Sequence, residues 1–338
     1  MATYKTIKGV KVESLASDPP AATSIGEVWY NTATDLLKYS IEGAGAWSTS
    51  NNLNTARDSG VGAGVIGAAM YAGGAAPARV TNTELYDGTS WTEVTGNLLA
   101  ATNIGSGFGT TTAAIFAGGH ATGYVQTSLT WDGTSWTAGN NIGTARGYMG
   151  GSGTQAAGQV AGGSYTAPAV PRTIYALTES YDGTSWSEEG NMQTARYSMA
   201  AAGASSTAAF IAGGVLTNPA GAPYTRTDKT ETWNGSSWTE GNTIASPRDE
   251  SSGCGTTTAA LITGGEFPSG AALTETYDGT SWTEVADLGT PRRLGGMSGG
   301  GTTSSTVYFG GGAGTPTVLA LTEEWADPVL AIKTVTTS

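Results

Sequence analysis

A six-residue segment with the composition of an active-site signature recurs along this chain. Tyr-Asp-Gly-Thr-Ser-Trp occurs at residues 86–91, 181–186 and 277–282, with close copies at 131–136 and 233–238. Each copy combines a carboxylate or amide with hydroxyl groups and aromatic rings. Asn234 replaces the Asp in one copy, and Asp-Gly or Asn-Gly between two short apolar runs is a strong hairpin signal, because the tight turn requires positive φ. We therefore expect turn-forming acids here, with no catalytic residue, metal or cofactor.

A pair of opposite charges recurs with the same period. An Arg stands ten residues after most of the repeated Trp residues, and a Thr-Glu precedes most of the hairpins. In the second unit the Arg becomes Thr102 and the Thr-Glu becomes Ser128-Leu129, so both charges are lost together. A buried charge left alone costs about 3–5 kcal/mol, so joint loss predicts that the two side chains touch. An anion-binding ring of Arg residues is the alternative. The predicted structural pairs involve Arg57, Arg146, Arg196, Arg248 and Arg292 with Glu84, Glu179, Glu231, Glu275 and Glu323.

These residues belong to six repeated units, which must supply the elements that position them. Each unit has an apolar strand closed by a double glycine, a third strand with the Thr-Glu, and a fourth strand at the Trp. The double glycines stand at 73–74, 118–119, 162–163, 213–214, 264–265 and 311–312. The aligned Trp residues are Trp47, Trp91, Trp136, Trp186, Trp238 and Trp282. Four-stranded units of about 40–50 residues predict an all-β fold, a β-propeller.

The order Arg, apolar strand, Gly-Gly, Tyr-Asp, Trp resembles the kelch family between Trp47 and Trp325. The resemblance implies a six-bladed kelch-like β-propeller with the double-glycine strand near the axis and the Trp strand outside. It implies no activity, because one fold hosts many functions. The last unit lacks a fourth strand before Pro328, and we expect Trp47–Ser50 to supply it. Seven blades are the alternative if Val28 to Ile41 forms an extra partial blade.

A second resemblance lies at the start of the chain. Residues 26–47 contain Gly-Glu-Val-Trp-Tyr-Asn and then Leu-Leu-Lys-Tyr, which is similar to segments near the start of bacteriophage tail-fibre and other virion proteins. The resemblance implies attachment to other virion proteins, with Trp29 and Tyr30 as contact candidates. We expect an extended attachment arm over 1–25, a β-hairpin module over 26–46, the propeller over 47–326 and a C-terminal tail over 327–338.

The composition excludes several classes of partner. Only 12% of residues are charged and the formal net charge is -12, against about 25% charged residues in an ordinary domain. Such neutral, wet surfaces suit extracellular or particle-bound proteins, and the acidic balance argues against nucleic acid. With one Cys and one His, neither a CxxC-type metal site nor a multi-His copper site can form. No apolar run is long enough to predict a membrane span.

Two long insertions are the best candidates for a binding surface. They occupy Ser164 to Ala176 in the third unit and Val215 to Asp228 in the fourth. Because strand direction alternates, both loops should share one face with the Trp-to-Arg connections. Loops on a rigid scaffold are where binding usually sits, although solvated length variation is the alternative. The contact candidates are Tyr165, Arg172, Tyr175, Tyr224 and Arg226.

These observations together predict a non-enzymatic structural or adhesion protein of a virion. The propeller would be displayed on a phage tail fibre or capsid, at the surface of an extracellular particle, and would bind a host-surface glycan or mediate assembly. A structural subunit of an extracellular filament or particle without its own ligand is the runner-up, and a glycan hydrolase is the third reading. A homo-oligomer stays open, since no heptad or collagen-like repeat requires one.

Overall fold

The computed structural model of the chain describes residues 12–20, 24, 26–42, 45–166, 171–217, 224–266, 270–299, 303–314, 317–327 and 330–335. All regular structure in these ranges is β-strand. None of the described residues forms a helix that could cross a membrane. The chain divides into two compact units, Met1–Gly45 with Asp327–Ser338, and Ala46–Ala326.

The larger unit contains six four-stranded antiparallel sheets within the described residues, which we call blades 1 to 6. Blade 1 comprises β5 (Val61–Val65), β6 (Ala68–Ala72), β7 (Thr83–Tyr86) and β8 (Trp91–Val94). Blade 2 comprises β9 (Ser106–Gly109), β10 (Ala114–Ala117), β11 (Ser128–Trp131) and β12 (Trp136–Ala138). Blade 3 comprises β13 (Gly150–Thr154), β14 (Ala157–Ala161), β17 (Thr178–Tyr181) and β18 (Trp186–Glu188). Blade 4 comprises β19 (Ala200–Ser205), β20 (Ala208–Ala212), β23 (Thr230–Trp233) and β24 (Trp238–Glu240). Blade 5 comprises β25 (Ser252–Gly255), β26 (Ala260–Thr263), β27 (Thr274–Tyr277) and β28 (Trp282–Glu284). Blade 6 comprises β29 (Gly296–Met297), β30 (Ser305–Phe309), β31 (Thr322–Ala326) and β4 (Ala46–Ser50).

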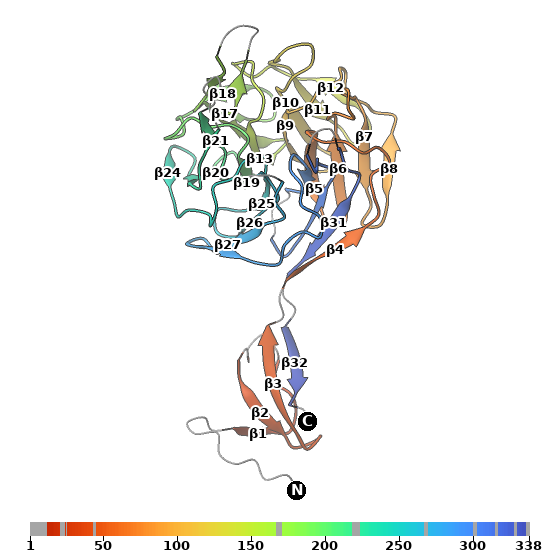
Figure 1. Ribbon diagram of the computed structural model, residues 1–338, viewed down its shortest axis with the longest axis vertical. Coiled ribbons are helices and arrows are strands. Elements are labelled where there is room, and N and C mark those ends of the chain that lie inside the picture. The colour runs from red at the N-terminus through yellow and green to blue at the C-terminus, as the bar shows by residue number, and fades with distance from the viewer. Residues whose placement is uncertain are drawn as a thin grey trace. The chain divides into compact units, whose positions relative to one another are not determined.

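The blades follow one another around a ring, so the larger unit is a β-propeller (Figure 1). The innermost strands β5, β9, β13, β19, β25 and β29 each contact the next, and β29 contacts β5 again. Blade 6 takes its outer strand from the beginning of the chain, with Trp47 opposite Trp325. This confirms the expected closing strand. Residues 28–31 and 36–42 lie in a different sheet, in the smaller unit, and add no blade.

The double glycines join each blade to the next. Both residues of the first pair have positive φ, 65° at Gly73 and 102° at Gly74, which L-residues rarely adopt. A Cβ on Gly73 would lie 2.5 Å from the Thr102 carbonyl oxygen, and the Gly74 N–H donates to that same oxygen at 2.9 Å. The second glycine of each of the other pairs donates an equivalent hydrogen bond to the segment that leads into the next blade. The last of these bonds, from Gly311 N–H to the Arg57 carbonyl at 3.0 Å, closes the ring.

Two sequence predictions about these glycines need correction. The last pair is Gly310–Gly311, with φ of 64° and 95°, so the predicted pair at 311–312 is one residue out of register. The double-glycine strand is also the second strand of its blade, because the small-residue strand before it lies innermost. Crowding at the axis explains this order: a Cβ on Gly107 of β9 would approach Val61 Cγ1 within 1.9 Å.

The repeated Trp residues connect neighbouring blades through one type of hydrogen bond. The indole N–H of Trp91 donates to Thr322 Oγ1 of blade 6 at 2.9 Å, and four other Trp residues bond the equivalent Thr of the preceding blade. Trp186 is the exception, because Ser128 stands at the Thr position. Both Trp186 Nε1 and Ser128 Oγ are buried and unpartnered. The Ser side chain lacks the methyl group that restricts the rotamer of Thr, so its hydroxyl is not held toward the indole N–H.

The smaller unit is a four-stranded sheet in the order β1 (Glu13–Leu15), β2 (Val28–Asn31), β3 (Leu36–Glu42) and β32 (Leu330–Thr334). β1 runs parallel to β2, and β32 pairs antiparallel with β3. Part of the predicted arm and part of the predicted tail are therefore strands of one sheet; residues 1–11 of the arm lie outside the described residues. A two-stranded hairpin is marginally stable alone, which accounts for the added strands.

Asp18 ties the predicted arm to the hairpin. Its carboxylate accepts from Trp29 Nε1 at 3.1 Å and Asn31 Nδ2 at 2.5 Å, and it pairs with Lys38 Nζ at 2.6 Å. The hydrogen bond from Lys38 lowers the pKa of Asp18 below its usual range. Trp29, predicted as an attachment residue, is 2% exposed and belongs to the interior of this sheet instead. Tyr30 is half-buried, and its hydroxyl donates to Asp35 Oδ1 at 3.1 Å.

Candidate binding site

The repeated arginines are enclosed inside the blades. Arg146 meets Glu179 at 2.5 Å, Arg248 meets Glu275 at 2.6 Å and Arg292 meets Glu323 at 2.8 Å. The other two predicted pairs, Arg57 with Glu84 and Arg196 with Glu231, are also in contact. All five arginines have no exposed surface, so no ligand reaches them. The structure thus brings each predicted pair together and leaves no anion-binding ring.

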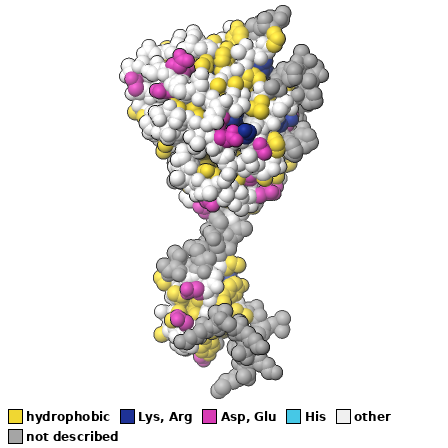
Figure 2. All heavy atoms as spheres, turned by 90° about the vertical axis from the view of Figure 1, so that its left-hand side faces the viewer, with side chains coloured by type: hydrophobic (Ala, Val, Ile, Leu, Met, Phe, Trp, Pro, Cys, Tyr) yellow, Lys and Arg dark blue, Asp and Glu magenta, His cyan; other side chains and the backbone are white. Residues whose placement is uncertain are grey.

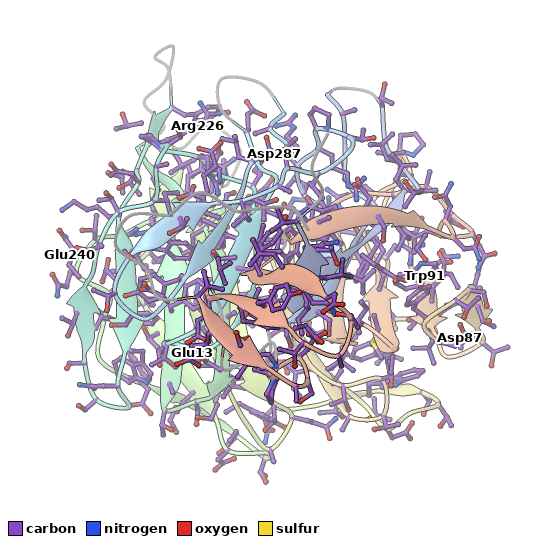
Figure 3. All side chains as sticks on the ribbon, turned by 90° about the horizontal axis from the view of Figure 1, so that it is seen from below. Glu13, Asp87, Trp91, Arg226, Glu240 and Asp287 are labelled. Carbon is purple, nitrogen blue, oxygen red and sulfur yellow. The ribbon has the colours of Figure 1, made fainter. Side chains whose placement is uncertain are left out.

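The repeated acids of the hairpins act locally. Asp87 Oδ1 accepts from the backbone N–H groups of Thr89 at 2.8 Å and Ser90 at 2.7 Å. The same bonds form at the other four hairpins, including the one with Asn234. At Asp132 the bonds from Ser135 and Thr134 lower the pKa to about 2. Asp87 lies at the rim of the propeller, well away from Arg226 (Figure 3).

A ring of six strained residues surrounds the propeller axis. Each follows the repeated Arg position by two residues and has φ between 51° and 58°. The N–H of each donates to the carbonyl of its counterpart in the preceding blade at 2.7–3.0 Å, and Ser59 donates to Leu294 to close the circle. A left-handed conformation costs an L-residue about 1–2 kcal/mol, which these bonds offset. We call this set the left-handed ring: Ser59, Ile104, Tyr148, Ser198, Glu250 and Leu294.

Two members of the left-handed ring, Tyr148 and Glu250, also line a cavity of about 90 Å³ on the loop face. Blades 3 to 6 all contribute to it. The two long loops reach it through short ribbons, β15 (Ser164–Tyr165) with β16 (Thr173–Ile174), and β21 (Val215–Thr217) with β22 (Thr225–Arg226). We call this cavity the polar pocket; it is lined by Tyr148, Arg172, Tyr197, Tyr224, Arg226, Asp249, Glu250, Glu266 and Arg293.

The three acids of the polar pocket share two arginines. Arg226 contacts Asp249 and lies 3.0 Å from Glu266, while Arg293 contacts Glu266 and lies 2.7 Å from Glu250. The pKa of Glu250 is raised to about 7, chiefly by burial; Arg293 opposes this rise, and the neighbouring Asp249 and Glu266 contribute to it. Glu250 therefore changes its charge near neutral pH.

Arg172 is held in the polar pocket by aromatic rings. Its guanidinium carbon lies 4.7 Å from the ring centroid of Tyr197 and 5.6 Å from that of Tyr148. Nη1 donates to the buried Ser164 Oγ at 2.9 Å, and Nε is enclosed without a hydrogen-bond partner. Among the described residues no carboxylate lies within ion-pair distance of Arg172. It is the one arginine lining the pocket for which the described part of the chain provides no ion-pair partner.

The structure brings together three of the five predicted contact residues, Arg172, Tyr224 and Arg226. Tyr165 packs against Tyr124 with centroids 5.4 Å apart, and it does not line the pocket. Tyr175 is half-buried and also lies outside the lining. Sequence reasoning missed the other residues of the pocket. Most of them stand one or two positions after the repeated Arg, where the units differ, and this variation is the signal that could have found them: Tyr148, Tyr197, Asp249, Glu250, Arg293.

A second cavity, of about 170 Å³, follows the propeller axis and is lined mainly by Gly, Ala and Ser of the innermost strands. It shares Tyr148 and Glu250 with the polar pocket. The two cavities therefore adjoin at the left-handed ring, and only the polar pocket carries a group of charged side chains.

No protein-family model matches the chain, and no curated protein matches it in sequence. Among solved structures it is similar to the one described as "Structure of YjhT", with a TM-score of 0.67 and 12% sequence identity over 82% of this chain and 98% of that chain. At such low identity the likeness supports the β-propeller fold alone.

Proposed function

We propose that this chain is a non-enzymatic virion protein that displays a propeller on a phage tail fibre or capsid and binds a host-surface glycan through the polar pocket. The observation that carries the glycan proposal is the combination, in one pocket, of Tyr rings, guanidinium donors and carboxylate acceptors. A sugar offers hydroxyl groups that donate and accept, together with flat C–H faces that stack on aromatic rings. The pocket provides all three kinds of partner.

The rigid scaffold beneath the pocket supports a binding role. Tyr148 and Glu250 sit on the left-handed ring, whose backbone is bonded around the whole axis. Their neighbours come from loops that differ among the blades. Loops carried by a fixed scaffold are a common place for recognition, and a pre-organised site loses less conformational entropy when it binds.

The virion setting is supported by the similarity of residues 26–47 to virion segments and by the surface. Charged side chains are sparse on the face shown in Figure 2, in line with 12% charged residues overall. The smaller unit has its own sheet, and we assign it the attachment role. Tyr30 stays the contact candidate there, since the side chain of Trp29 is buried.

Glycan hydrolysis is the second candidate, and one observation favours it. A carboxyl group whose pKa is about 7, as at Glu250, suits a general acid in glycoside cleavage. Against this, each of the three pocket carboxylates is paired with Arg226 or Arg293. A nucleophile or base would have to leave its ion pair, so we favour binding without cleavage.

The test is a glycan array probed with the whole chain, followed by solution binding of the strongest ligands. We expect binding that Tyr197→Ala weakens at least tenfold, because Tyr197 carries one wall of the pocket and supports Arg172. Tyr175→Ala is the matched control, being a half-buried Tyr of the same loop region outside the lining. Absence of any bound glycan, or equal effects of the two variants, would refute the glycan proposal.

Two further measurements test for glycan hydrolysis and for the presence of the protein in a virion. Release of reducing sugar from the bound glycan would replace binding by hydrolysis, and loss of that release in Glu250→Gln would identify the acid. Immunogold electron microscopy of purified phage particles checks the virion assignment, which fails if the label is absent from the tail fibre and the capsid.

A further inference from the structure

The charges of the polar pocket are unevenly compensated. Asp249, Glu250 and Glu266 are all engaged by Arg226 and Arg293, so no free carboxylate is left for the third arginine. Arg172 has two Tyr rings and one hydroxyl as its partners. A half-buried guanidinium without an ion-pair partner is poorly stabilised where its nitrogens are enclosed, so an anion that reaches its open side would bind favourably.

The three guanidinium nitrogens of Arg172 are in different situations. Nη1 is bonded to Ser164 Oγ at 2.9 Å, and Nε is enclosed. Nη2 has no hydrogen-bond partner among the described residues, yet it is absent from the enclosed unpartnered atoms. Nη2 is therefore accessible, and stacking on Tyr148 and Tyr197 fixes its direction. A pre-oriented donor of this kind is what a charge-assisted hydrogen bond requires.

We propose that the ligand of the polar pocket is an acidic sugar whose carboxylate binds Arg172 at Nη2. This inference rests on the proposed glycan-binding function and names the class of glycan. Arg172 is the arginine of the pocket that contacts none of the three carboxylates, and a ligand with one negative charge would supply its missing partner. A phosphate monoester carries about −1.5 to −2 charges near neutral pH, and the three carboxylates nearby would repel the excess. The sugar hydroxyls would then bond the acids and arginines that line the rest of the pocket.

The experiment uses matched glycans that differ only in the carboxyl group. Oligosaccharides containing glucuronate or galacturonate are compared with their carboxyl-reduced forms, which contain glucose or galactose, and with sulfated forms of the latter. Binding to the whole chain is measured by ligand-observed NMR and titration calorimetry. We expect the uronates to bind about tenfold to a hundredfold more tightly than the reduced forms, as a charge-assisted hydrogen bond predicts.

Arg172→Gln should remove this preference, because the uronates should lose at least tenfold more affinity than the reduced forms lose. Ser164→Ala, which frees Nη1, should reduce the preference by a smaller factor. Arg79→Gln is the control, because Arg79 is an exposed arginine of the propeller that bonds Asn103 Oδ1 at 3.0 Å outside the pocket; it should behave like the wild type. Thermal melting establishes that each variant is folded.

The possible results distinguish recognition of an acidic sugar from glycan binding in general. Equal affinity for uronate and reduced forms, or a preference that survives Arg172→Gln, overturns the acidic-sugar inference and leaves glycan binding intact. Equal or tighter binding of the sulfated forms shows that negative charge, and not a carboxylate, is recognised, which also overturns it. If no glycan of any kind binds, the proposed function itself is wrong.

Discussion

The propeller contains two sets of arginine–carboxylate contacts that share the same chemical groups but differ in burial, in the number of partners and in how they recur among the blades. One set repeats inside five blades, with each Arg fully buried against one Glu. The other joins three acids and two arginines from different blades in the polar pocket, and these arginines are partly exposed. Neither arginine of the second set has a counterpart at the same position in every blade. The first set holds a blade together, and the second is free to vary.

The cost of a broken contact explains this difference. An enclosed charge that loses its partner is strongly destabilising. Blade 2 accordingly lacks both charges of the pair, with Thr102 at the Arg position and Leu129 at the Glu position. A partly solvated charge in a shared network retains water and other partners, and exposed pairs contribute little to stability. Positions of the second kind can therefore acquire new side chains without unfolding the propeller.

The sharpest way to break this comparison is Glu179→Ala, which leaves Arg146 alone in blade 3. We expect the free energy of unfolding to fall by about 3–5 kcal/mol, measured by urea denaturation. The double variant Arg146→Thr with Glu179→Leu reproduces the residues of blade 2 and should recover much of the loss. An unchanged midpoint for Glu179→Ala would show that the enclosed pairs do not hold the blades.

The second prediction concerns the pH dependence of stability at Glu250. Its pKa in the folded protein is about 7, above the usual 4.5, so the folded state binds this proton more tightly than the unfolded chain. The resulting stabilisation is complete below pH 4.5 and is lost as the pH rises to about 7. Two and a half pH units correspond to about 3 kcal/mol.

Glu250→Gln removes the titrating group, so it should flatten that part of the profile. Between pH 4.5 and pH 8 the wild type should lose about 3 kcal/mol more than the variant in denaturant unfolding. Other acids titrate in both proteins and cancel in the difference. Parallel profiles would mean that Glu250 ionises normally and that water solvates it in the pocket.

Blade 2 offers a stabilising change in the repeated interior. Ser128→Thr restores the residue that bonds the indole in the other blades, so Trp186 Nε1 and the hydroxyl should satisfy one another. Removing two buried unpartnered groups should raise the free energy of unfolding by roughly 1–2 kcal/mol. Ser128→Ala removes only the hydroxyl and should gain less. A lower stability for Ser128→Thr would indicate that the site has no space for the methyl group.

The smallest expected effect tests the left-handed ring. At Ser198, with φ of 57°, Gly fits the backbone without strain whereas Ala does not. We expect Ser198→Gly to be more stable than Ser198→Ala by about 1 kcal/mol, the reverse of their order in an ordinary strand. Both changes remove the buried, unpartnered Ser198 hydroxyl, so thermal melting of the two isolates the backbone contribution. The opposite order would mean that position 198 relaxes out of the left-handed conformation.

The interior of the propeller could be predicted from the sequence because it repeats. Six aligned units predicted four strands per blade with the Trp strand outermost, although the innermost strand was misplaced, and the joint absence of both charges from the second unit indicated the contact between Arg and Glu. Pro328 after the last third strand indicated that Trp47 completes the ring. Each of these inferences used one unit as a control for another, which a single copy would not allow.

The polar pocket and the smaller sheet could not be predicted in the same way. Tyr148, Glu250 and Arg293 look like irregularities beside the repeated Arg, and only the ring geometry brings blades 3 to 6 to one place. The pairing of β32 with β3 joins the two ends of the chain, for which no local pattern exists. The register error at Gly310 arose because three glycines in a row, 310–312, leave the alignment ambiguous.

The borrowed strand β4 has a consequence for synthesis of the protein. Ser48 pairs with Glu324, 276 positions later, so blade 6 cannot form until the residues of β31 have left the ribosome. The smaller sheet must likewise wait for β32. Contacts this distant in sequence make folding slow, although the entropy of closing the loop grows only with the logarithm of its length. β4 must therefore wait, without its partner strand, while all the intervening blades are synthesised.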